Sequence, residues 1–397
     1  MKLFQINAVP YGSTGSIMVQ LADAARQQGH QVLCTTGFTW KKCSRPYHFI
    51  TSNILEKTIH SHQARLTGRI GCFSRGATKR MLKRLDEFEP DVIHLHNLHG
   101  WFVNLPMLFD YIRRKNIPVV WTLHDCWAFT GHCPHFDSIG CEKWKTGCHS
   151  CPLFRLYPRT YFDCSKTMYR LKKQWFAGVE NLTIVTPSRW LADQVKQSFL
   201  ADYPVQVIHN GIDLRVFSPG GGDVRTSYGL ENKHMILGVA YAWDDKKGLD
   251  VFLELENQLP EDYRIVLVGT DEHVEQRLPE GIIPIRRTQS REELAELYGA
   301  ADVFVNPSRE DTFPTVNMEA LACGTPVLTF DTGGSPEIPD ESCGAVVPKN
   351  DIHSMEQQIR RICESRPYSK EACVARAAGF SRERAIAQYL SLYGSKL

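Results

Sequence analysis

The sequence predicts an α/β protein with two doubly wound domains, each a parallel sheet covered by helices on both faces. Short β-branched apolar runs alternate with amphipathic stretches along the whole chain, and this alternation is typical of parallel sheets. The chain has 397 residues, whereas a single hydrophobic core stops growing at about 250–300 residues. Because 43% of the residues are hydrophobic, there is material for two cores, which excludes a disordered or fibrous chain.

The predicted strands are short runs rich in Val, Ile, Leu and Thr, residues that favour β structure. In the first half they are Leu3–Asn7, Gln31–Thr35, Asp91–His96, Pro118–His124, Leu182–Thr186 and Val205–His209. In the second half they are His234–Val239, Tyr263–Val268, Asp302–Asn306 and Thr325–Phe330. Helical periodicity is clearest over Ser16–Gln28, Leu105–Lys115, Arg189–Leu200 and Arg382–Leu392.

A turn-rich segment, Ser218–Asp223, marks the domain boundary. We therefore expect a first domain over 1–211, a linker over 212–224 and a second domain over 225–380. The remaining residues, 381–397, are expected to form a helix that packs back on the first domain. Two doubly wound domains in tandem bind ligands in the cleft between them, at the carboxyl ends of the strands.

The formal net charge of +2 conceals a strong asymmetry between the two halves. Residues 1–200 contain 26 Lys/Arg and 13 Asp/Glu, whereas residues 201–397 contain 20 and 31. Residues 65–84 contain seven basic and no acidic side chains. This stretch is predicted to bind an anionic membrane surface, with a solvated helix face as the alternative. Nucleic acid is not expected as a partner, because there is no recognised module and no aromatic interleaving of the basic residues.

The N-terminal sequence reads as a strand, without the apolar stretch and cleavage site of a signal peptide. No apolar run reaches the roughly 18–20 residues that span a bilayer. We therefore expect a cytoplasmic protein, peripheral at the inner face of the plasma membrane, with reduced cysteines.

The segment Pro307–Pro326 carries the strongest signal of a ligand site. It starts at the end of a strand and enters a predicted helix at about Pro314, and a helix N-terminus is suited to bind an anion. Asp311 precedes the helix and Glu319 lies within it. Carboxylates beside a phosphate-binding helix suit a sugar nucleotide, because they would accept hydrogen bonds from its hydroxyls. The alternative is a helix with an acidic N-terminal cap.

This segment resembles the E-x7-E region of retaining glycosyltransferases of family 4. The supporting motifs follow in the expected order: Asp91-Val-Ile-His-Leu-His-Asn97, Thr122-Leu-His-Asp125, His209-Asn-Gly-Ile-Asp213, Lys247-Gly248 and Asp331-Thr-Gly-Gly-Ser-Pro-Glu337. The resemblance implies the GT-B architecture, with two Rossmann-like domains facing a cleft. It also implies transfer from a nucleotide-diphosphate sugar with retention of configuration and without a catalytic metal.

The resemblance assigns catalytic roles to four residues. Lys247 would bind the donor diphosphate, Glu319 the ribose hydroxyls and Asp311 the transferred sugar, while His124 would lie beside the sugar or the acceptor. The short residues around Gly15, after the first strand, would let a ligand approach the backbone. Further donor contacts are expected from Lys246, Phe313 and Thr315.

The sequence departs from the family pattern at three positions. Asp311 stands where the family has glutamate, and Pro314 where it has glycine. Tyr241 stands where an arginine is usual, and we expect Lys246 to supply the missing charge.

A cysteine-rich insertion at 126–164 follows His124. Cys133, Cys141, Cys148 and Cys151 have the spacing C-x7-C-x6-C-x2-C, which predicts a structural zinc site, because thiolates hold zinc tetrahedrally. The alternatives are buried reduced cysteines or disulfides. The insertion resembles that of colanic-acid and other exopolysaccharide glycosyltransferases, and we expect it to form a wall of the acceptor side.

The sequence therefore predicts a retaining glycosyltransferase that uses a glycan or lipid-diphosphate-linked acceptor in bacterial surface polysaccharide or capsule synthesis. Two alternatives remain open. One is another enzyme of the same architecture, such as a sugar-nucleotide epimerase or a phosphorylase. The other is a non-catalytic carbohydrate- or nucleotide-binding subunit.

Overall fold

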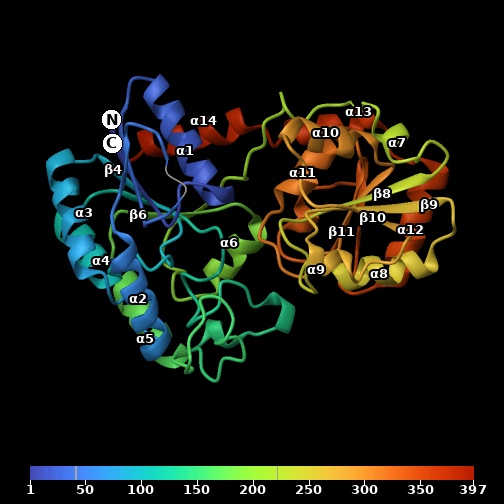
Figure 1. Ribbon diagram of the computed structural model, residues 1–397. Coiled ribbons are helices and arrows are strands. Elements are labelled where there is room, and N and C mark those ends of the chain that lie inside the picture. The colour runs from blue at the N-terminus through green and yellow to red at the C-terminus, as the bar shows by residue number, and fades with distance from the viewer. Residues whose placement is uncertain (41–42, 221) are drawn as a thin grey trace. The chain divides into compact units, whose positions relative to one another are not determined.

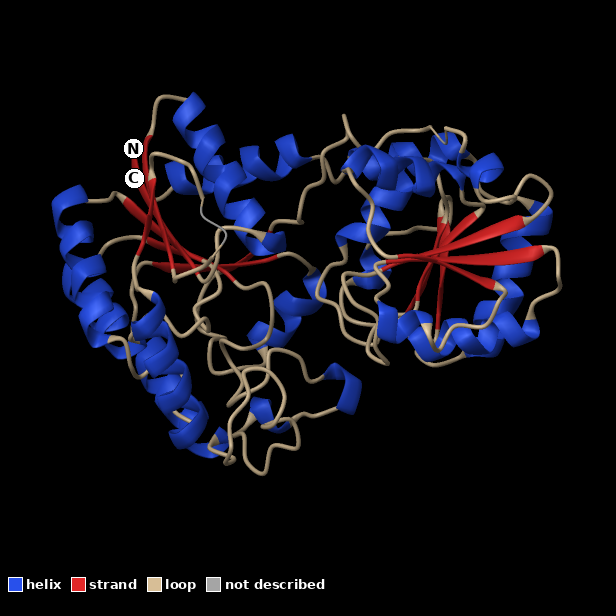
Figure 2. Cartoon of the chain, viewed as in Figure 1, coloured by secondary structure: helices blue, strands red, loops and turns tan. Residues whose placement is uncertain are grey.

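The computed structural model describes residues 1–40, 43–220 and 222–397, which form two compact units. The first unit contains Met1–Ile208 and Ile386–Leu397, and the second contains His209–Ala385. Each unit is an α/β sandwich with helices on both faces of its sheet (Figures 1 and 2).

The segment 212–224, expected as a linker, lies within the second unit. Ile212 forms an isolated parallel bridge with Ser381, and Phe217 is buried in the core of that unit. Gly221, which belongs to this segment, lies outside the described residues.

The first sheet has seven parallel strands in the order β3-β2-β1-β4-β5-β6-β7. The strands are β1 (Lys2–Asn7), β2 (Gln31–Thr36), β3 (His48–Ile50), β4 (Val92–Leu95), β5 (Val119–Thr122), β6 (Leu182–Thr186) and β7 (Val205–Val207). The helices are α1 (Gly12–Gln27), α2 (Ile54–Thr67), α3 (Arg75–Phe88), α4 (Leu105–Lys115), α5 (Ser165–Phe176), α6 (Arg189–Lys196) and α14 (Arg382–Gly394). The insertion contributes two short 3-10 turns, Asp137–Ile139 and Lys143–Lys145.

The C-terminal helix α14 completes the first unit. The Tyr393 hydroxyl lies 2.6 Å from His94 Nδ1, and the Tyr389 hydroxyl lies 3.0 Å from Thr122 Oγ1. Both tyrosines are buried with Met18 of α1 in one core cluster. The last residues of the chain therefore cover the face of the first sheet that α1 also covers.

The second sheet has six parallel strands in the order β10-β9-β8-β11-β12-β13. The strands are β8 (His234–Val239), β9 (Tyr263–Val268), β10 (Ile282–Ile285), β11 (Val303–Asn306), β12 (Val327–Phe330) and β13 (Gly344–Val347). The helices are α7 (Val224–Ser227), α8 (Leu249–Gln258), α9 (Glu272–Glu275), α10 (Arg291–Ala300), α11 (Thr315–Ala322), α12 (Ile352–Ser365) and α13 (Lys370–Ala378), and Ser335–Glu337 forms a 3-10 turn.

Both strand orders reverse once, between β1 and β4 in the first unit and between β8 and β11 in the second. Doubly wound sheets bind ligands at such reversals, beside the carboxyl ends of the strands. The loops after β1, β4, β8 and β11 are therefore the places to look for a site. Among the described residues, no helix is both long and apolar enough to span a membrane.

Candidate active site

In the second unit, the loop after β8 and the loop after β11 are tied together. The backbone N–H of Arg309 donates to the carbonyl of Lys246 (2.8 Å), and the Ser308 hydroxyl donates to the same carbonyl (3.4 Å). These loops flank the reversal of the strand order, so they carry Lys247 and Asp311 to one place.

Lys247 is bound by the acidic loop after β11. Its Nζ donates to Asp311 Oδ2 (2.9 Å) and to the Ser308 hydroxyl (3.3 Å). Burial would lower the pKa of Lys247, but the charge of Asp311 and their hydrogen bond outweigh it and raise the pKa. The ammonium group is therefore charged at neutral pH, and its third N–H can bind an anion.

Gly248 lets the loop that carries Lys247 pack closely against Pro307. Its φ is +77°, and a Cβ there would lie 2.6 Å from both the Cγ and the carbonyl oxygen of Pro307. A left-handed backbone and this close approach both require glycine. The Lys-Gly pair is thus explained by the packing of two loops as well as by a ligand.

Lys246, like Lys247, pairs with a carboxylate of the loop after β11. Its Nζ donates to Glu310 Oε2 at 2.7 Å, and the Glu310 side chain is only 4% exposed. The charge expected of Lys246 in place of the missing arginine is therefore shared with Glu310, as that of Lys247 is shared with Asp311.

The turn 331–335 packs directly on Asp311. A Cβ on Gly333, whose φ is +56°, would overlap the Asp311 carbonyl, and the Gly334 N–H donates to that carbonyl (3.2 Å). Thr332 Oγ1 and Ser335 Oγ in this turn are buried and make no hydrogen bond among the described residues. Because buried polar atoms are normally paired with protein or with ordered water, these hydroxyls can bind a polar group beside Asp311.

The helix α11 begins at Thr315, with Pro314 as its N-cap. No side chain caps this N-terminus, so the orphan N–H groups of the first turn, with the helix dipole, favour an anion there. Thr315 stands at the first helical position. Phe313 is buried instead, stacked on His209 with ring centroids 4.7 Å apart, so we assign it to the core.

Glu319 lies further along α11 and accepts a hydrogen bond from the Tyr298 hydroxyl (3.2 Å). Burial raises its pKa to about 7, against the charge of Arg291 and the Tyr298 hydrogen bond, which lower it. A carboxyl that titrates near neutral pH in a site is a common feature of functional residues.

In the first unit, His124 follows β5 and contacts a second histidine. His124 Nε2 lies 3.1 Å from His96 Nδ1, and the two rings are nearly parallel. His96 Nε2 in turn lies 3.1 Å from Gln5 Oε1 on β1. The sequence analysis identified His124 as a site residue but did not identify His96 or Gln5, although His96 stands in the strand motif of 91–97.

Asp125 is held by a third histidine. His99 Nε2 lies 2.9 Å from Asp125 Oδ2, and the Trp127 N–H donates to Asp125 Oδ1 (2.8 Å). Burial would raise the pKa of Asp125, but His99 and these hydrogen bonds outweigh it and lower the pKa to about 2. The turn after β5 therefore carries a fixed negative charge beside His124.

Gly15 is a glycine for a structural reason. A Cβ on it would lie 2.5 Å from the carbonyl carbon of Pro10 and 2.8 Å from the Val9 carbonyl oxygen. The residue therefore lets the loop after β1 fold onto α1, and this contact accounts for it without a ligand.

The predicted zinc site is not found. No group of three or more His, Cys, Asp or Glu side chains in 1–40, 43–220 and 222–397, which include all four cysteines, is placed to hold a metal ion. Cys133 instead hydrogen-bonds with Cys151, which raises the pKa of Cys133 and lowers that of Cys151. Cys148 Sγ accepts the Gly131 N–H (3.1 Å).

The insertion is ordered by packing. Trp144 is buried against Phe129 and Phe136 (centroids 5.2 and 4.9 Å). The buried Lys172 of α5 donates to two carbonyls of the insertion, those of Trp127 (2.7 Å) and Thr130 (3.1 Å). The sequence analysis missed Lys172, because a lysine in an amphipathic helix is usually exposed.

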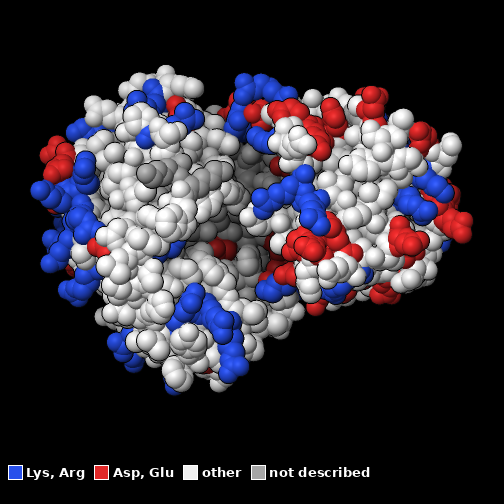
Figure 3. Space-filling model, viewed as in Figure 1, with Lys and Arg blue, Asp and Glu red and all other residues white. Residues whose placement is uncertain are grey.

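The basic stretch 65–84 is split by the structure between the end of α2 and α3. Its apolar residues Ile70 and Met81 are buried, and Arg80 pairs with Glu56 (2.6 Å). Basic side chains nevertheless gather along the left edge of the molecule in Figure 3, where α3 lies in Figure 1. The exposed surface of this stretch is therefore formed mainly by basic side chains, together with the exposed Leu66 at its start.

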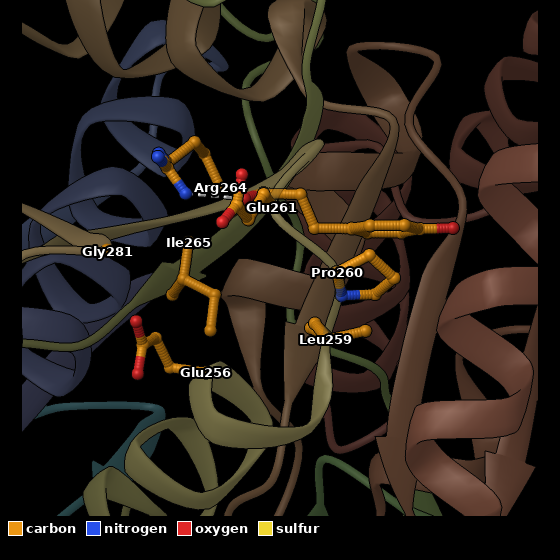
Figure 4. Close-up of a pocket in the computed structure, with 8 residues that line it drawn as sticks. Glu256, Leu259, Pro260, Glu261, Arg264, Ile265 and Gly281 are labelled. Atoms are coloured by element: carbon orange, nitrogen blue, oxygen red, sulfur yellow. Dashed lines mark hydrogen bonds between the residues drawn. The ribbon is translucent and has the colours of Figure 1, made fainter.

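Two cavities lie away from the residues described above. One, of about 190 Å³, is lined by residues that include Glu256, Glu261 and Arg264 (Figure 4). Another, of about 590 Å³, is lined by residues that include Lys233 and Asp302. The first lies at the amino-terminal ends of β9 and β10 and the second at those of β8 and β11, opposite the edge that carries Lys247 and Asp311.

Two family models match the chain. The model described as Glycosyltransferase Family 4 matches residues 14–216, about half of the chain, and the model described as Glycosyl transferases group 1 matches residues 233–365.

Curated relatives carry related names. The chain is 26% identical over 317 residues to the putative colanic acid biosynthesis glycosyl transferase WcaC of Escherichia coli, covering 77% of this chain and 76% of that protein. It is 30% identical over 205 residues to a D-inositol 3-phosphate glycosyltransferase of Mycobacterium, covering 48% of this chain and 46% of that protein. The chain thus spans about half the length of the latter relative.

Solved structures share the fold over nearly the whole chain. A sucrose-phosphate synthase from Thermosynechococcus elongatus superposes with a TM-score of 0.71 at 18% identity, covering 99% of this chain and 98% of that one. Anabaena Alr3699/HepE, solved in complex with UDP, gives 0.69 at 16% identity and covers 99% of both chains. These likenesses and the two parallel sheets confirm the predicted fold class, the GT-B architecture, and the family matches confirm the resemblance seen in the motifs. The chain belongs to glycosyltransferase family 4.

Proposed function

We propose that this protein transfers a sugar from a nucleotide-diphosphate sugar to a glycan or lipid-diphosphate-linked acceptor, with retention of configuration, in bacterial surface or exopolysaccharide synthesis. The contact between Lys247 Nζ and Asp311 Oδ2 carries this proposal, because it joins a cation for the diphosphate and a carboxylate for the sugar. The similarity to WcaC supports the pathway, and the UDP complex of the Anabaena protein makes uridine diphosphate the first nucleotide to test.

The difficult step in such a transfer is departure of the nucleoside diphosphate from the sugar. Negative charge develops on the leaving phosphate, and preorganised donors stabilise it best. Lys247 and the N-terminus of α11 supply those donors, and Asp311 binds the transferred sugar. The acceptor oxygen bonds to the anomeric carbon on the face from which the diphosphate leaves, and its proton passes to a phosphate oxygen. No step in this proposal requires a metal.

Glu319 and His124 complete the proposed set. Glu319 accepts hydrogen bonds from the ribose hydroxyls, and His124 contacts a hydroxyl of the reacting sugar. Thr315 and the hydroxyls of Thr332 and Ser335 would donate hydrogen bonds to the phosphates.

The first test identifies the donor by binding and then measures its turnover. Thermal shift against a panel of nucleoside diphosphates and their sugars identifies the nucleotide, since a ligand that binds only the folded state stabilises it. With that donor, Lys247→Ala should lower kcat/KM at least about 10²-fold, the usual cost of losing one charge-stabilising donor. Lys233→Ala is the matched control, because Lys233 Nζ donates to the Glu261 carbonyl (2.8 Å) at the opposite end of β8, away from Lys247. Turnover unchanged in Lys247→Ala would contradict the assignment, and a product of inverted anomeric configuration would contradict retention.

We also propose that the first unit binds anionic membrane through the basic side chains of 65–84. Arg69, Arg75, Lys79 and Lys83 are exposed. The neighbouring helix α2 exposes Leu55 (64%) and Leu66 (59%), and exposed apolar groups beside basic ones suit a lipid surface.

A further inference from the structure

A chain of three polar side chains links the core of the first sheet to His124. Gln5 lies on β1, His96 follows β4 and His124 follows β5. Gln5 and His96 are buried, with exposed fractions of 0% and 1%. The contacts are Gln5 Oε1 to His96 Nε2 (3.1 Å) and His96 Nδ1 to His124 Nε2 (3.1 Å).

The direction of every hydrogen bond in this chain follows from one backbone carbonyl. Gln5 Nε2 lies 3.1 Å from the carbonyl oxygen of Met18. A carbonyl can only accept, so the amide must present its N–H₂ to Met18 and its oxygen to His96. The amide oxygen also only accepts, so His96 Nε2 must carry a hydrogen.

A neutral imidazole carries one hydrogen, and this fixes the second contact. With its hydrogen on Nε2, His96 has only a lone pair on Nδ1, so His124 Nε2 must donate to it. His124 Nδ1 then bears a lone pair and is an acceptor.

Both rings are neutral at neutral pH. Burial, with the neighbouring His94 and His124, lowers the pKa of His96 well below its ordinary value. Burial also lowers the pKa of His124 to about 4, although Asp125 opposes it. Each of the two rings therefore carries one hydrogen at neutral pH.

We propose that Gln5 and His96 are positioning residues that hold His124 in its Nε2–H tautomer, so that His124 Nδ1 accepts a hydrogen bond from a substrate hydroxyl. A phosphate oxygen has no hydrogen to offer this nitrogen, so His124 selects the sugar and not the diphosphate. The identity of that hydroxyl as a sugar hydroxyl rests on the proposed function, whereas the tautomer does not.

Nuclear magnetic resonance of protein labelled with ¹⁵N at histidine tests the tautomer directly. Two-bond ¹⁵N–¹H correlations distinguish a protonated from an unprotonated ring nitrogen, and the spectrum of His124→Gln assigns the His124 signals. We expect His124 and His96 to be protonated at Nε2 and not at Nδ1. A His124 protonated at Nδ1 in the wild-type protein overturns the proposal, and the tautomer is read from the wild-type protein, with His124→Gln used only for the assignment.

Variants of Gln5 test the causal link. Gln5→Met keeps the volume and removes the acceptor, so we expect the pair to populate the opposite tautomers and kcat/KM to fall roughly 10-fold, since a wrong histidine tautomer impairs catalysis. Gln5→Glu keeps an acceptor oxygen towards His96 and should restore both the His124 signals and turnover. Gln27→Met, at an exposed position on α1, is the matched control.

The two readouts separate the two proposals. If Gln5→Met lowers turnover while the His124 tautomer is unchanged, the positioning role is wrong. If the tautomers are as expected but the wild-type protein transfers no sugar from any donor tested, the proposed function fails and the tautomer assignment stands.

Discussion

Glu319 shows how burial changes what a single side chain can do. Its pKa is raised to about 7 from an ordinary value of 4.5, with burial as the main cause. Between these pH values the folded protein keeps a proton that the unfolded chain has released. The stabilising contribution of this group is therefore complete below pH 4.5 and is lost as the pH rises through 7.

We expect the Glu319→Gln substitution to remove this pH dependence. Between pH 5 and 8, the free energy of unfolding of the wild-type protein should fall relative to the variant by about 1–2 kcal/mol, because the carboxyl is partly exposed and the shift must be discounted. Urea denaturation at several pH values measures this difference. An equal pH dependence in both proteins would show that Glu319 does not titrate near neutrality.

At the scale of elements, close contacts between loops position the residues that we propose to bind the donor. Gly248 and Gly229 both have positive φ, +77° and +65°. A Cβ on Gly248 meets Pro307 at 2.6 Å, whereas a Cβ on Gly229 has no atom within 4 Å. Substitutions at these two glycines therefore separate the effect of backbone strain from that of a clash with Pro307.

We expect Gly248→Ala to destabilise the protein by about 2–4 kcal/mol and to impair donor binding, because the loop that carries Lys247 must move. Gly229→Ala should cost only about 1 kcal/mol, the cost of the left-handed backbone. Thermal denaturation and donor affinity of the two variants check this. Equal losses in both variants would mean that the contact with Pro307 is unimportant.

The insertion 126–164 depends on α5 through Lys172. Burial lowers the pKa of Lys172 to about 7. Its Nζ donates to two carbonyls and lies 3.4 Å from the centroid of the Trp127 ring. We expect Lys172→Ala to destabilise the protein by about 2–4 kcal/mol, because it leaves buried carbonyls unpaired. Limited proteolysis should then cleave within the insertion. The neighbouring Lys173→Ala, at an exposed position of the same helix, should have no effect.

At the scale of the whole molecule, the charges are divided between the two halves of the chain. The 26 basic and 13 acidic residues of 1–200 contrast with 20 and 31 in 201–397. The second unit therefore binds its anionic donor, in our proposal, through Lys247 and the N-terminus of α11, against an unfavourable overall field.

Replacing Arg69, Arg75 and Lys79 together with serine should weaken binding to vesicles that contain anionic lipid about 10²-fold, at about 1 kcal/mol per charge. Replacing the exposed Arg277, Arg287 and Arg361 of the second unit is the control and should change little. Vesicle sedimentation at low and high salt measures both. Binding that is insensitive to salt and to the first set of substitutions would contradict membrane attachment through α3.

The strands that the sequence analysis identified are all present, whereas β3, β10 and β13 were missed. All three lie at sheet edges, where one side of the strand is unpaired and the apolar pattern is weaker. β10 contains Pro284, which an edge strand tolerates because its missing N–H need not pair. Helix α4 was predicted with its observed bounds, since Asn104 caps it and basic residues end it.

The sequence by itself determined the fold class and the family, because parallel sheets and loop motifs produce local sequence patterns. The same motifs predicted Lys247, Asp311, Glu319 and His124 as candidate site residues. Only the tertiary structure decided the partners of these residues. The contact of Lys247 with Asp311, the pairing of Lys246 with Glu310 and the chain from Gln5 to His124 each join segments more than 25 positions apart. Burial of Glu319 and Lys172, and the pairing of cysteines expected to bind zinc, likewise depend on packing that no local pattern encodes.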